Sequence, residues 1–304
     1  MKKSTLIGSA AGLLIVAALV YQLLPAPEVR IPAQLPPSER PEHRLLNFEG
    51  IANFRDLGGY ETVDGRRVKW GRLYRTGSMA HTTDADRQAL AALNLTALID
   101  FRSSLEKAEE PHRLPSPTTF SVIEIPILDE GNESMVSDIR NRIENGDFDG
   151  FDPDQLMRGA NRQFADEFTP QFSQFIDQVQ AAQGQPIAWN CSAGKDRTGF
   201  AAAVLLRILG VPQAVVMRDY MASKEPSVES RQGMLLMLRI LQGEETAAKL
   251  ERLMGVEEDW LAAAFDEIDQ RWGGFDNYVS EGLGLSDDDV ERLRDSLLET
   301  PDAT

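Results

Sequence analysis

The stretch from Gln185 to Val211 constrains the fold more than any other part of the chain, because it joins two buried elements through a short loop. The run QPIAWNCS (185–192) is short and apolar, which is typical of a buried strand. After the loop, GFAAAVLLRILGV (199–211) is apolar on nearly all sides. This pattern predicts a buried helix that ends at Gly210.

Two further runs resemble this strand. ALNLTALIDFR (92–102) ends in a β-rich apolar segment, and FSVIEIPIL (120–128) is a second one. Helical stretches such as QFADEFTPQFSQFIDQVQAA (163–182) lie between the strands, and the chain from Pro226 onward is amphipathic and helical. The alternation predicts an α/β fold with a central, mainly parallel sheet flanked by helices, and a helical C-terminal third.

The first 24 residues have the pattern of a segment that enters a membrane. Lys2 and Lys3 precede an uncharged run from Leu6 to Leu24, which is at the lower edge of the length that spans a bilayer. An uncleaved anchor and a cleaved signal both stay open, and the length favours the anchor. Because positive charges stay in the cytoplasm, either segment predicts an exported protein, anchored at the periplasmic face of the inner membrane or secreted.

Residues 25–43 hold six prolines. This composition predicts an extended linker rather than part of a core. From Arg44 the composition becomes that of a globular protein, so we expect one domain over residues 44–304.

The charge and the cysteine count exclude several classes of protein. A formal net charge of −17 argues against nucleic-acid binding, and any anionic substrate needs a local concentration of positive charge. The single cysteine excludes an intramolecular disulfide and a multi-cysteine metal site. His43, His81 and His112 lack the spacing of metal ligands, so we expect neither a metal nor another cofactor.

The loop CSAGKDRTG (191–199) places the only cysteine just before the buried helix. Amides at a helix N-terminus are free donors, and the small residues Ser192, Ala193 and Gly194 allow the loop to fold around an anion. The same partial positive charge stabilises a thiolate at Cys191.

Three larger side chains complete a site for a phosphoryl group. Arg197, six residues after Cys191, offers a planar fork for two phosphoryl oxygens, and Lys195 adds a point charge. Thr198 is placed to donate a hydrogen bond to the sulfur. The set predicts attack on phosphorus with a cysteinyl-phosphate intermediate.

Other interpretations of the loop fit less well. A nucleotide-binding Walker loop needs glycine and Ser/Thr where Trp189 and Asp196 stand. A thiol–disulfide motif needs a second cysteine. A purely structural cysteine leaves Gly194, Lys195 and Arg197 unexplained together.

The loop resembles the Cys-x5-Arg-Thr/Ser loop of the protein tyrosine phosphatase superfamily. Its Gly-Lys-Asp-Arg-Thr-Gly form is similar to that of atypical bacterial tyrosine and dual-specificity phosphatases, some of which also hydrolyse phosphoinositides. The resemblance extends from about Leu46 to about Leu298 and implies a phosphatase-type α/β fold, no metal and a two-step mechanism. Four further stretches resemble the same branch: NFRDLGGY (53–60), LYRTGSM (73–79), DFRSSLEKAEEP (100–111) and RDYMAS (218–223).

By position, the resemblance implies roles for the whole loop. Cys191 corresponds to the nucleophile, Arg197 to the phosphate clamp, and Thr198 to the hydroxyl that assists departure of the thiolate. The superfamily usually has histidine before the cysteine, whereas this chain has Asn190. Because an amide carries no charge, we expect the thiolate to be less stabilised than usual. The cradle consists of Ser192, Ala193, Gly194, Lys195 and Asp196.

The general acid has two candidates. Asp129 follows the strand VIEIPIL, and Asp196 lies inside the loop; both stay open. Arg102, at the end of a strand, is expected to help bind substrate, with a surface ion pair as the alternative. Three residues are expected to order the N-terminal part of the site: Asn53, Arg55 and Asp56.

The sequence therefore predicts a phosphomonoester hydrolase, in first place a protein-tyrosine or dual-specificity phosphatase, with a phosphorylated protein as its partner. A phosphoinositide phosphatase is one alternative, because Lys195 suits a multiply charged headgroup and the N-terminal segment places the domain near a membrane. A catalytically inactive phospho-binding module is the other, and Asn190 keeps it open.

Overall fold

The computed structural model describes residues 28–127, 141–142, 145, 147–148 and 150–300. The predicted anchor or signal segment (1–24) and the candidate acid Asp129 lie outside these residues. Within the described part of the chain, none of the helices has both the length and the apolar character needed to cross a bilayer.

Most of the strands form a central sheet. In the described residues it has five strands in the order β1, β3, β6, β4, β5. β1 pairs with β3 antiparallel, and the other neighbours pair parallel, so the predicted mainly parallel sheet is confirmed. The strands are β1 (Arg55–Asp56), β3 (Leu73–Thr76), β6 (Ile187–Asn190), β4 (Ala97–Asp100) and β5 (Ser121–Glu124).

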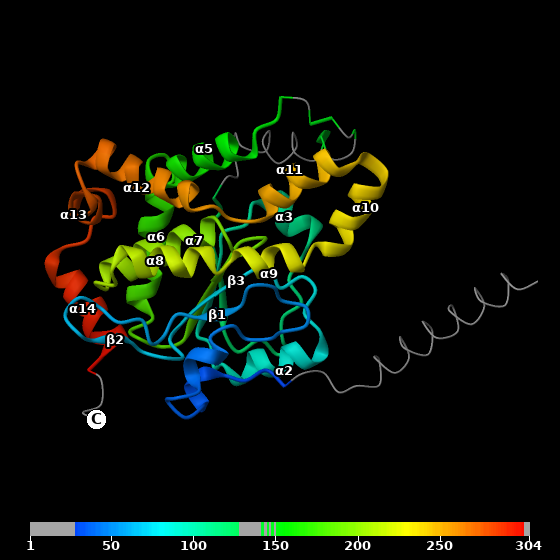
Figure 1. The fold of residues 1–304 in the computed structure, drawn as a ribbon. Coiled ribbons are helices and arrows are strands. Elements are labelled where there is room, and N and C mark those ends of the chain that lie inside the picture. Colours follow the sequence, from blue (N-terminus) through cyan, green and yellow to red (C-terminus); the bar gives the residue numbers. More distant parts are fainter. Residues whose placement is uncertain (1–27, 128–140, 143–144, 146, 149, 301–304) are drawn as a thin grey trace, which may run out of the picture.

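Successive residues of the central strands enter two different apolar clusters. Ile99 and Trp189 belong to the larger cluster on one face of the sheet, whereas Leu98 and Ala188 belong to the smaller cluster on the other face. Side chains of a strand alternate between the faces of a sheet, so a strand that is buried on both faces is apolar throughout. Figure 1 shows α2 on one side of the sheet and α6 and α7 on the other.

Helices cover both faces and make up most of the chain after β6, as predicted. An antiparallel pair, β2 (Arg67–Val68) and β7 (Leu298–Glu299), joins the end of the domain to its beginning. The helices are α2 (Asp84–Ala92), α3 (Ser104–Glu109), α5 (Pro153–Ala165), α6 (Thr169–Ala181), α7 (Arg197–Ile208), α8 (Gln213–Met221), α9 (Lys224–Glu229), α10 (Gln232–Gln242), α11 (Glu244–Met254), α12 (Glu258–Trp272), α13 (Phe275–Asn277) and α14 (Asp287–Leu297), with a π-helical turn η3 (Tyr278–Gly282).

The central helix α7 agrees with its sequence pattern. Every residue from Thr198 to Leu206 is buried, and Gly210 adopts a positive φ of 89° just beyond the helix. The stretch 163–182, in contrast, is not one helix. α5 ends at Ala165 and α6 begins at Thr169, because Pro170 is suited to a first helical turn and not to a helix interior.

The Pro-rich segment is described from residue 28. It forms two short 3-10 helices, η1 (Pro32–Gln34) and η2 (Arg40–His43), and Ile31 is buried in the smaller cluster beside Leu46 and Tyr74. This part of the predicted linker therefore packs against the domain. The boundaries of the linker stay a prediction.

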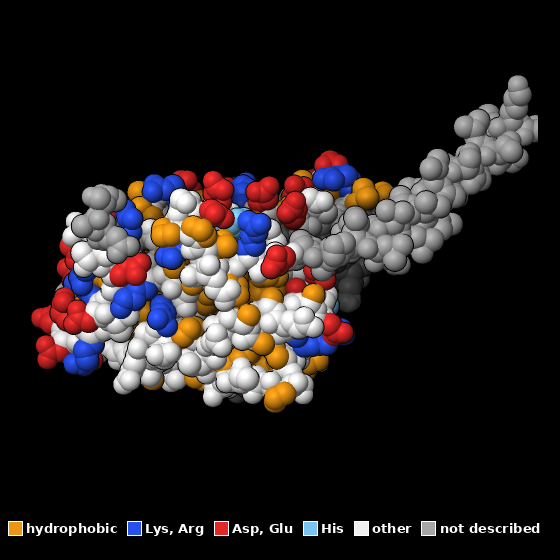
Figure 2. Space-filling view, turned by 90° about the horizontal axis from the view of Figure 1, so that it is seen from below, with side chains coloured by type: hydrophobic (Ala, Val, Ile, Leu, Met, Phe, Trp, Pro, Cys, Tyr) orange, Lys and Arg blue, Asp and Glu red, His pale blue; other side chains and the backbone are white. Residues whose placement is uncertain are grey.

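Acidic and basic side chains are interspersed on the face shown in Figure 2, and the described residues in that view form no broad basic patch. With a net charge of −17, this pattern suits a soluble surface more than a surface that binds a polyanion. Positive charge that serves an anionic ligand has to be concentrated locally.

Candidate active site

The site lies where three parallel strands end at the same edge of the sheet. Thr76, Asp100 and Asn190 are the last residues of β3, β4 and β6, and they are paired in register across the sheet. Cys191 follows directly, is 3% exposed and has a free thiol. The carboxyl edge of a parallel sheet is the usual place for a binding site in an α/β fold.

The carbonyl groups of residues 192–195 all accept hydrogen bonds from the segment 53–78. The Asn53 amide donates to the carbonyls of Ala193 (3.3 Å) and Gly194 (2.8 Å). The Arg75 guanidinium donates to the carbonyls of Gly194 (2.8 Å) and Lys195 (3.3 Å). The backbone amide of Ser78 donates to the Ser192 carbonyl at 3.0 Å.

This arrangement turns the loop amides the other way. In a planar trans peptide, a carbonyl and the following N–H point in opposite directions. Since the carbonyls of residues 192–195 are occupied on one side, the amides of residues 193–196 point to the opposite side. Amides aligned in this way are able to form a cradle for an anion.

Gly194 permits the turn. Its φ is +68°, and a Cβ at this position would lie 2.5 Å from backbone atoms of Thr76 and Gly77. The loop therefore packs directly against the end of β3, and only glycine fits both the backbone angle and the space.

Behind the loop, two arginines share one carboxylate. Arg75 lies 2.7 Å from Asp219 of α8, and Arg55 lies 3.5 Å from the same side chain; all three are buried. Arg55 also bonds to Asn53 and to the Ser223 hydroxyl. Burial alone would raise the pKa of Asp219, but the two arginines outweigh it and hold the pKa at about 2. Five residues thus form one network of hydrogen bonds and ion pairs beneath the loop: Asn53, Arg55, Arg75, Asp219 and Ser223.

Arg197, the first residue of α7, is held by a carboxylate that the sequence reading did not single out. Its two terminal nitrogens lie 2.7 Å and 2.6 Å from the two oxygens of Glu106. The Ser192 hydroxyl donates to the same carboxylate. Glu106 thus fixes the guanidinium plane from outside the loop.

Glu106 can reach Arg197 because it is also part of a helix cap. Its carboxylate accepts from the Ser103 amide (2.8 Å), and the Ser103 hydroxyl accepts from the Glu106 amide (3.2 Å), which is a capping box at the start of α3. Burial alone would raise the pKa of Glu106, but the charge and hydrogen bonds of Arg197 and the bond from Ser192 lower it from 4.5 to about 2.

Lys195 and Asp196 bind each other. The Lys195 ammonium lies 2.6 Å from the Asp196 carboxylate and 5.1 Å from the centre of the Trp260 ring of α12. The Tyr220 hydroxyl donates to the other Asp196 oxygen at 3.3 Å. Lys195 is only 6% exposed, so its charge is largely neutralised inside the protein.

Two expectations for single residues do not fit the geometry. Arg102 is 1% exposed and binds Asp100, the Ser78 hydroxyl and the Glu110 carbonyl, so it has no surface to offer a substrate. It acts on the loop indirectly, since Ser78 also holds the Ser192 carbonyl. The Thr198 hydroxyl is buried and has no hydrogen-bond partner among the described residues, so the predicted bond to the sulfur is absent from this structure.

Several residues of the site were not predicted from the sequence, although they lie in the stretches that resemble the phosphatase branch. Arg75 and Asp219 lie in LYRTGSM and RDYMAS, and both contact or support the loop. Glu106 carried a signal of its own, because Ser103 and Glu106 have the spacing of a capping box. No local pattern indicates that these residues meet their partners, which lie between 86 and 144 positions away in the sequence.

With the geometry known, the chain can be compared with other proteins. Residues 46–299 match the model of the tyrosine phosphatase family. The chain belongs to that family. It is a tyrosine phosphatase-like enzyme, so the predicted family and enzyme class are confirmed.

Two relatives extend this result. A putative tyrosine-protein phosphatase of Cupriavidus necator is 35% identical over 252 residues, which cover 82% of this chain and 86% of the relative. The triple specificity protein phosphatase PtpB of Mycobacterium tuberculosis is 30% identical over 280 residues, which cover 84% and 99%. A crystal structure of P. aeruginosa TpbA in complex with pTyr matches over 66% of this chain and 89% of its own, with 14% identity and a TM-score of 0.29.

The first prediction concerns Gly194. Gly194→Ala places a Cβ against the backbone of Thr76 and Gly77 and strains the positive φ, which costs roughly 1–2 kcal/mol of stability. A displacement of the cradle on the order of 1 Å lowers turnover by about 10²-fold. Gly233→Ala is the matched control, because nothing lies within 4 Å of its Cβ and the residue is helical. In urea unfolding, Gly233→Ala should raise the free energy of unfolding by up to about 1 kcal/mol. If both substitutions changed the free energy of unfolding in the same direction, the close packing assigned to Gly194 would be contradicted.

The second prediction concerns the pH dependence of the Glu106–Arg197 pair. Because the pKa of Glu106 is lowered to about 2 in the folded state, the pair stabilises the fold fully above the unfolded pKa of 4.5 and loses this effect as the pH falls towards 2. Glu106→Gln should therefore lower the free energy of unfolding by about 1–3 kcal/mol at neutral pH, the cost of leaving a hydrogen-bonding group of Arg197 unsatisfied. In urea unfolding, the difference in the free energy of unfolding between this variant and the parent should become smaller below about pH 4.5. The exposed Glu281→Gln should show neither effect.

Proposed function

We propose that this enzyme hydrolyses phosphotyrosine in proteins, alone or together with phosphoserine and phosphothreonine, through a phosphorylated Cys191. The observation that carries the proposal is the orientation of the loop. The carbonyls of residues 192–195 are held by Asn53, Arg75 and Ser78, so the amides of the next four peptides face the other way. Such a cradle, together with Arg197, stabilises the negative charge on the equatorial oxygens of a phosphoryl group in transfer.

The reaction proceeds in two displacements. The Cys191 thiolate attacks phosphorus, an S–P bond forms, and the bond to the leaving oxygen breaks. A carboxylic acid gives that oxygen its proton. Water then attacks the phosphocysteine, the same carboxylate accepts a proton from the water, and inorganic phosphate and the thiolate are released.

Of the two candidate acids, Asp196 is the one that the structure describes. It lies in the loop, bound by Lys195 and the Tyr220 hydroxyl, and its side chain is 16% exposed. Asp129 lies outside the described residues and stays a candidate.

The phosphoinositide alternative gains little from the geometry. It relied on Lys195 as a free charge for a headgroup, whereas the ammonium is paired with Asp196 and packed against Trp260. The name of the mycobacterial relative, a triple specificity phosphatase, keeps a broad substrate range within the proposal.

The test uses p-nitrophenyl phosphate with EDTA present, and compares the parent with Cys191→Ser. We expect metal-independent turnover that the substitution abolishes, because a hydroxyl at this position is a far weaker nucleophile. A folded parent that binds vanadate but turns nothing over would instead identify an inactive phospho-binding module.

The same assay separates the two acids. With phenyl phosphate, whose leaving group needs its proton more than p-nitrophenol does, the true acid variant should lose about 10²-fold or more, and the loss should be smaller with p-nitrophenyl phosphate. Asp196→Asn and Asp129→Asn are the matched pair. Equal losses on both substrates in both variants would leave neither residue as the acid.

We also propose, from the sequence of residues 1–24, that the domain is exported and held at the outer side of the inner membrane. The support is the apolar run behind Lys2 and Lys3. Carbonate extraction of membranes should leave the full chain in the pellet and release a form that starts at Arg44. Release of the protein in a shortened form would point to a cleaved signal, and release of the complete chain would point to no membrane segment.

A further inference from the structure

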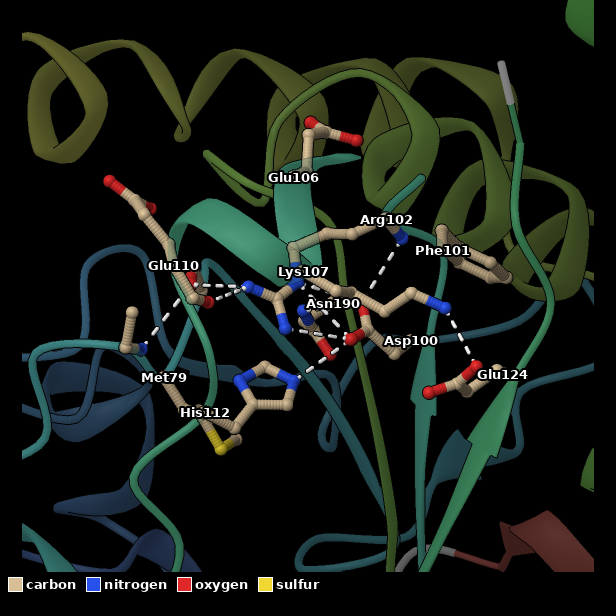
Figure 3. Close-up of polar contacts among 12 residues, drawn as sticks. Met79, Asp100, Phe101, Arg102, Glu106, Lys107, Glu110, His112, Glu124 and Asn190 are labelled. Atoms are coloured by element: carbon tan, nitrogen blue, oxygen red, sulfur yellow. Dashed lines mark hydrogen bonds and ion pairs between the residues drawn. The ribbon is translucent and has the colours of Figure 1, made fainter. Parts of the chain in front are cut away.

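A line of three side chains connects the residue before the cysteine to the edge of the domain. The Asn190 amide donates to Asp100 Oδ1 at 3.1 Å, and His112 Nε2 lies 3.0 Å from Asp100 Oδ2. Figure 3 shows the His112 ring pointing at this carboxylate from the segment that follows α3. Asn190 and Asp100 are buried, and the His112 side chain is 10% exposed.

Asp100 is the hub of this line. Arg102 binds both carboxylate oxygens, at 3.0 Å and 2.9 Å, and the Arg102 amide donates to Oδ1 at 3.0 Å. Burial alone would raise the pKa of Asp100, but the bonds from His112 and Arg102 outweigh it and keep the pKa below its usual value. The carboxylate is therefore ionised and held by partners on several sides.

The orientation of the Asn190 side chain depends on this carboxylate. Its Nδ2 bonds to Asp100 and, at 3.3 Å, to the carbonyl of Cys191, whereas its Oδ1 is buried without a partner among the described residues. With Oδ1 unpaired, only the two bonds of Nδ2 determine which way the amide is turned. The shorter of them goes to Asp100, and the other contacts the backbone of Cys191.

We propose that His112 is a positioning residue for Cys191, acting through Asp100 and Asn190. His112 Nε2 contacts the outer oxygen of Asp100 at 3.0 Å, although neither ring nitrogen has a hydrogen bond of good geometry among the described residues. The contact places the imidazole against the outer oxygen, so that the inner oxygen stays directed at the Asn190 amide and the end of β6 stays fixed. His112 does not touch the substrate. The inference rests on the proposed role of Cys191 as nucleophile, and it gives this chain a partner system behind the position where the superfamily usually has histidine.

Two substitutions at His112 differ in reach. Glutamine places its amide nitrogen close to the position of Nε2, whereas asparagine ends one bond short, at the position of Nδ1. We expect His112→Asn to lower kcat about tenfold with little change in KM, because the loss is one of alignment. His112→Gln should stay within about threefold of the parent. His81→Asn is the matched control, since that ring is exposed and its contact with Glu110 is long, at 3.7 Å.

The rate of alkylation by iodoacetamide distinguishes a positioning role of His112 from a role in stability alone. Cys191 is the only cysteine, so the alkylation rate and its pH profile report on this thiol alone. The substitution leaves Arg197 and the loop amides unchanged, so a change in rate reports on the position of the thiol. We expect His112→Asn to be alkylated several-fold more slowly than the parent at a fixed pH, and His112→Gln to keep the rate of the parent.

The route is tested by combining variants. If His112 acts through Asn190, adding His112→Asn to Asn190→Ala causes no further loss. If Asn190→Ala does not fold, Asp100→Asn takes its place in the cycle. Additive losses, equal impairment of His112→Gln and His112→Asn, or a His112→Asn variant like the parent would overturn the proposal. A parent without turnover would overturn the proposed function instead, and the alkylation comparison would still decide this one.

Discussion

The structure depends on the way in which the loop after β6 is held by its carbonyls. Asn53 and Arg75 bind the carbonyls of residues 193–195 from behind, and peptide planarity then commits the following amides to the other side. Aligned amides are sufficient to bind an anion, but they do not by themselves keep the loop in that conformation. Here the energy that fixes the loop comes from buried polar groups beneath it, so the site is formed before any ligand binds.

That support requires buried charge, and the arginines beneath and beside the loop are each paired with a carboxylate. Arg55 and Arg75 share Asp219, Arg102 binds Asp100, and Arg197 binds Glu106. Removing one member of such a pair leaves the other uncompensated in a medium of low polarity, which is far more harmful than losing the pair as a whole. A net charge of −17 is compatible with an anionic substrate because the acids near the site are already neutralised by these arginines.

The sequence predicted the elements whose signals are local, and it missed those that depend on distant partners. The strands at 97–100, 121–124 and 187–190, the buried helix α7 and the loop could be read from apolar runs and one glycine. β1 and β3 were not assigned as strands, because they are short and carry buried arginines that resemble surface residues in a sequence. Arg102 was placed at the substrate for the same reason: burial of a charged side chain becomes visible only with its partner. Asp129 and the N-terminal segment stay predictions.

The four stretches that resembled the phosphatase branch make physical sense once they are seen as one network. NFRDLGGY supplies Asn53 and Arg55, LYRTGSM supplies Arg75, and RDYMAS supplies Asp219, all of which meet beneath the loop. DFRSSLEKAEEP adds two carboxylates of different function. Asp100 binds Asn190, the residue before the cysteine, and Glu106 binds Arg197, six residues after it. One helix cap and one strand end therefore hold the loop at both of its ends, so a shift of α3 against β4 would displace Cys191 and Arg197 together.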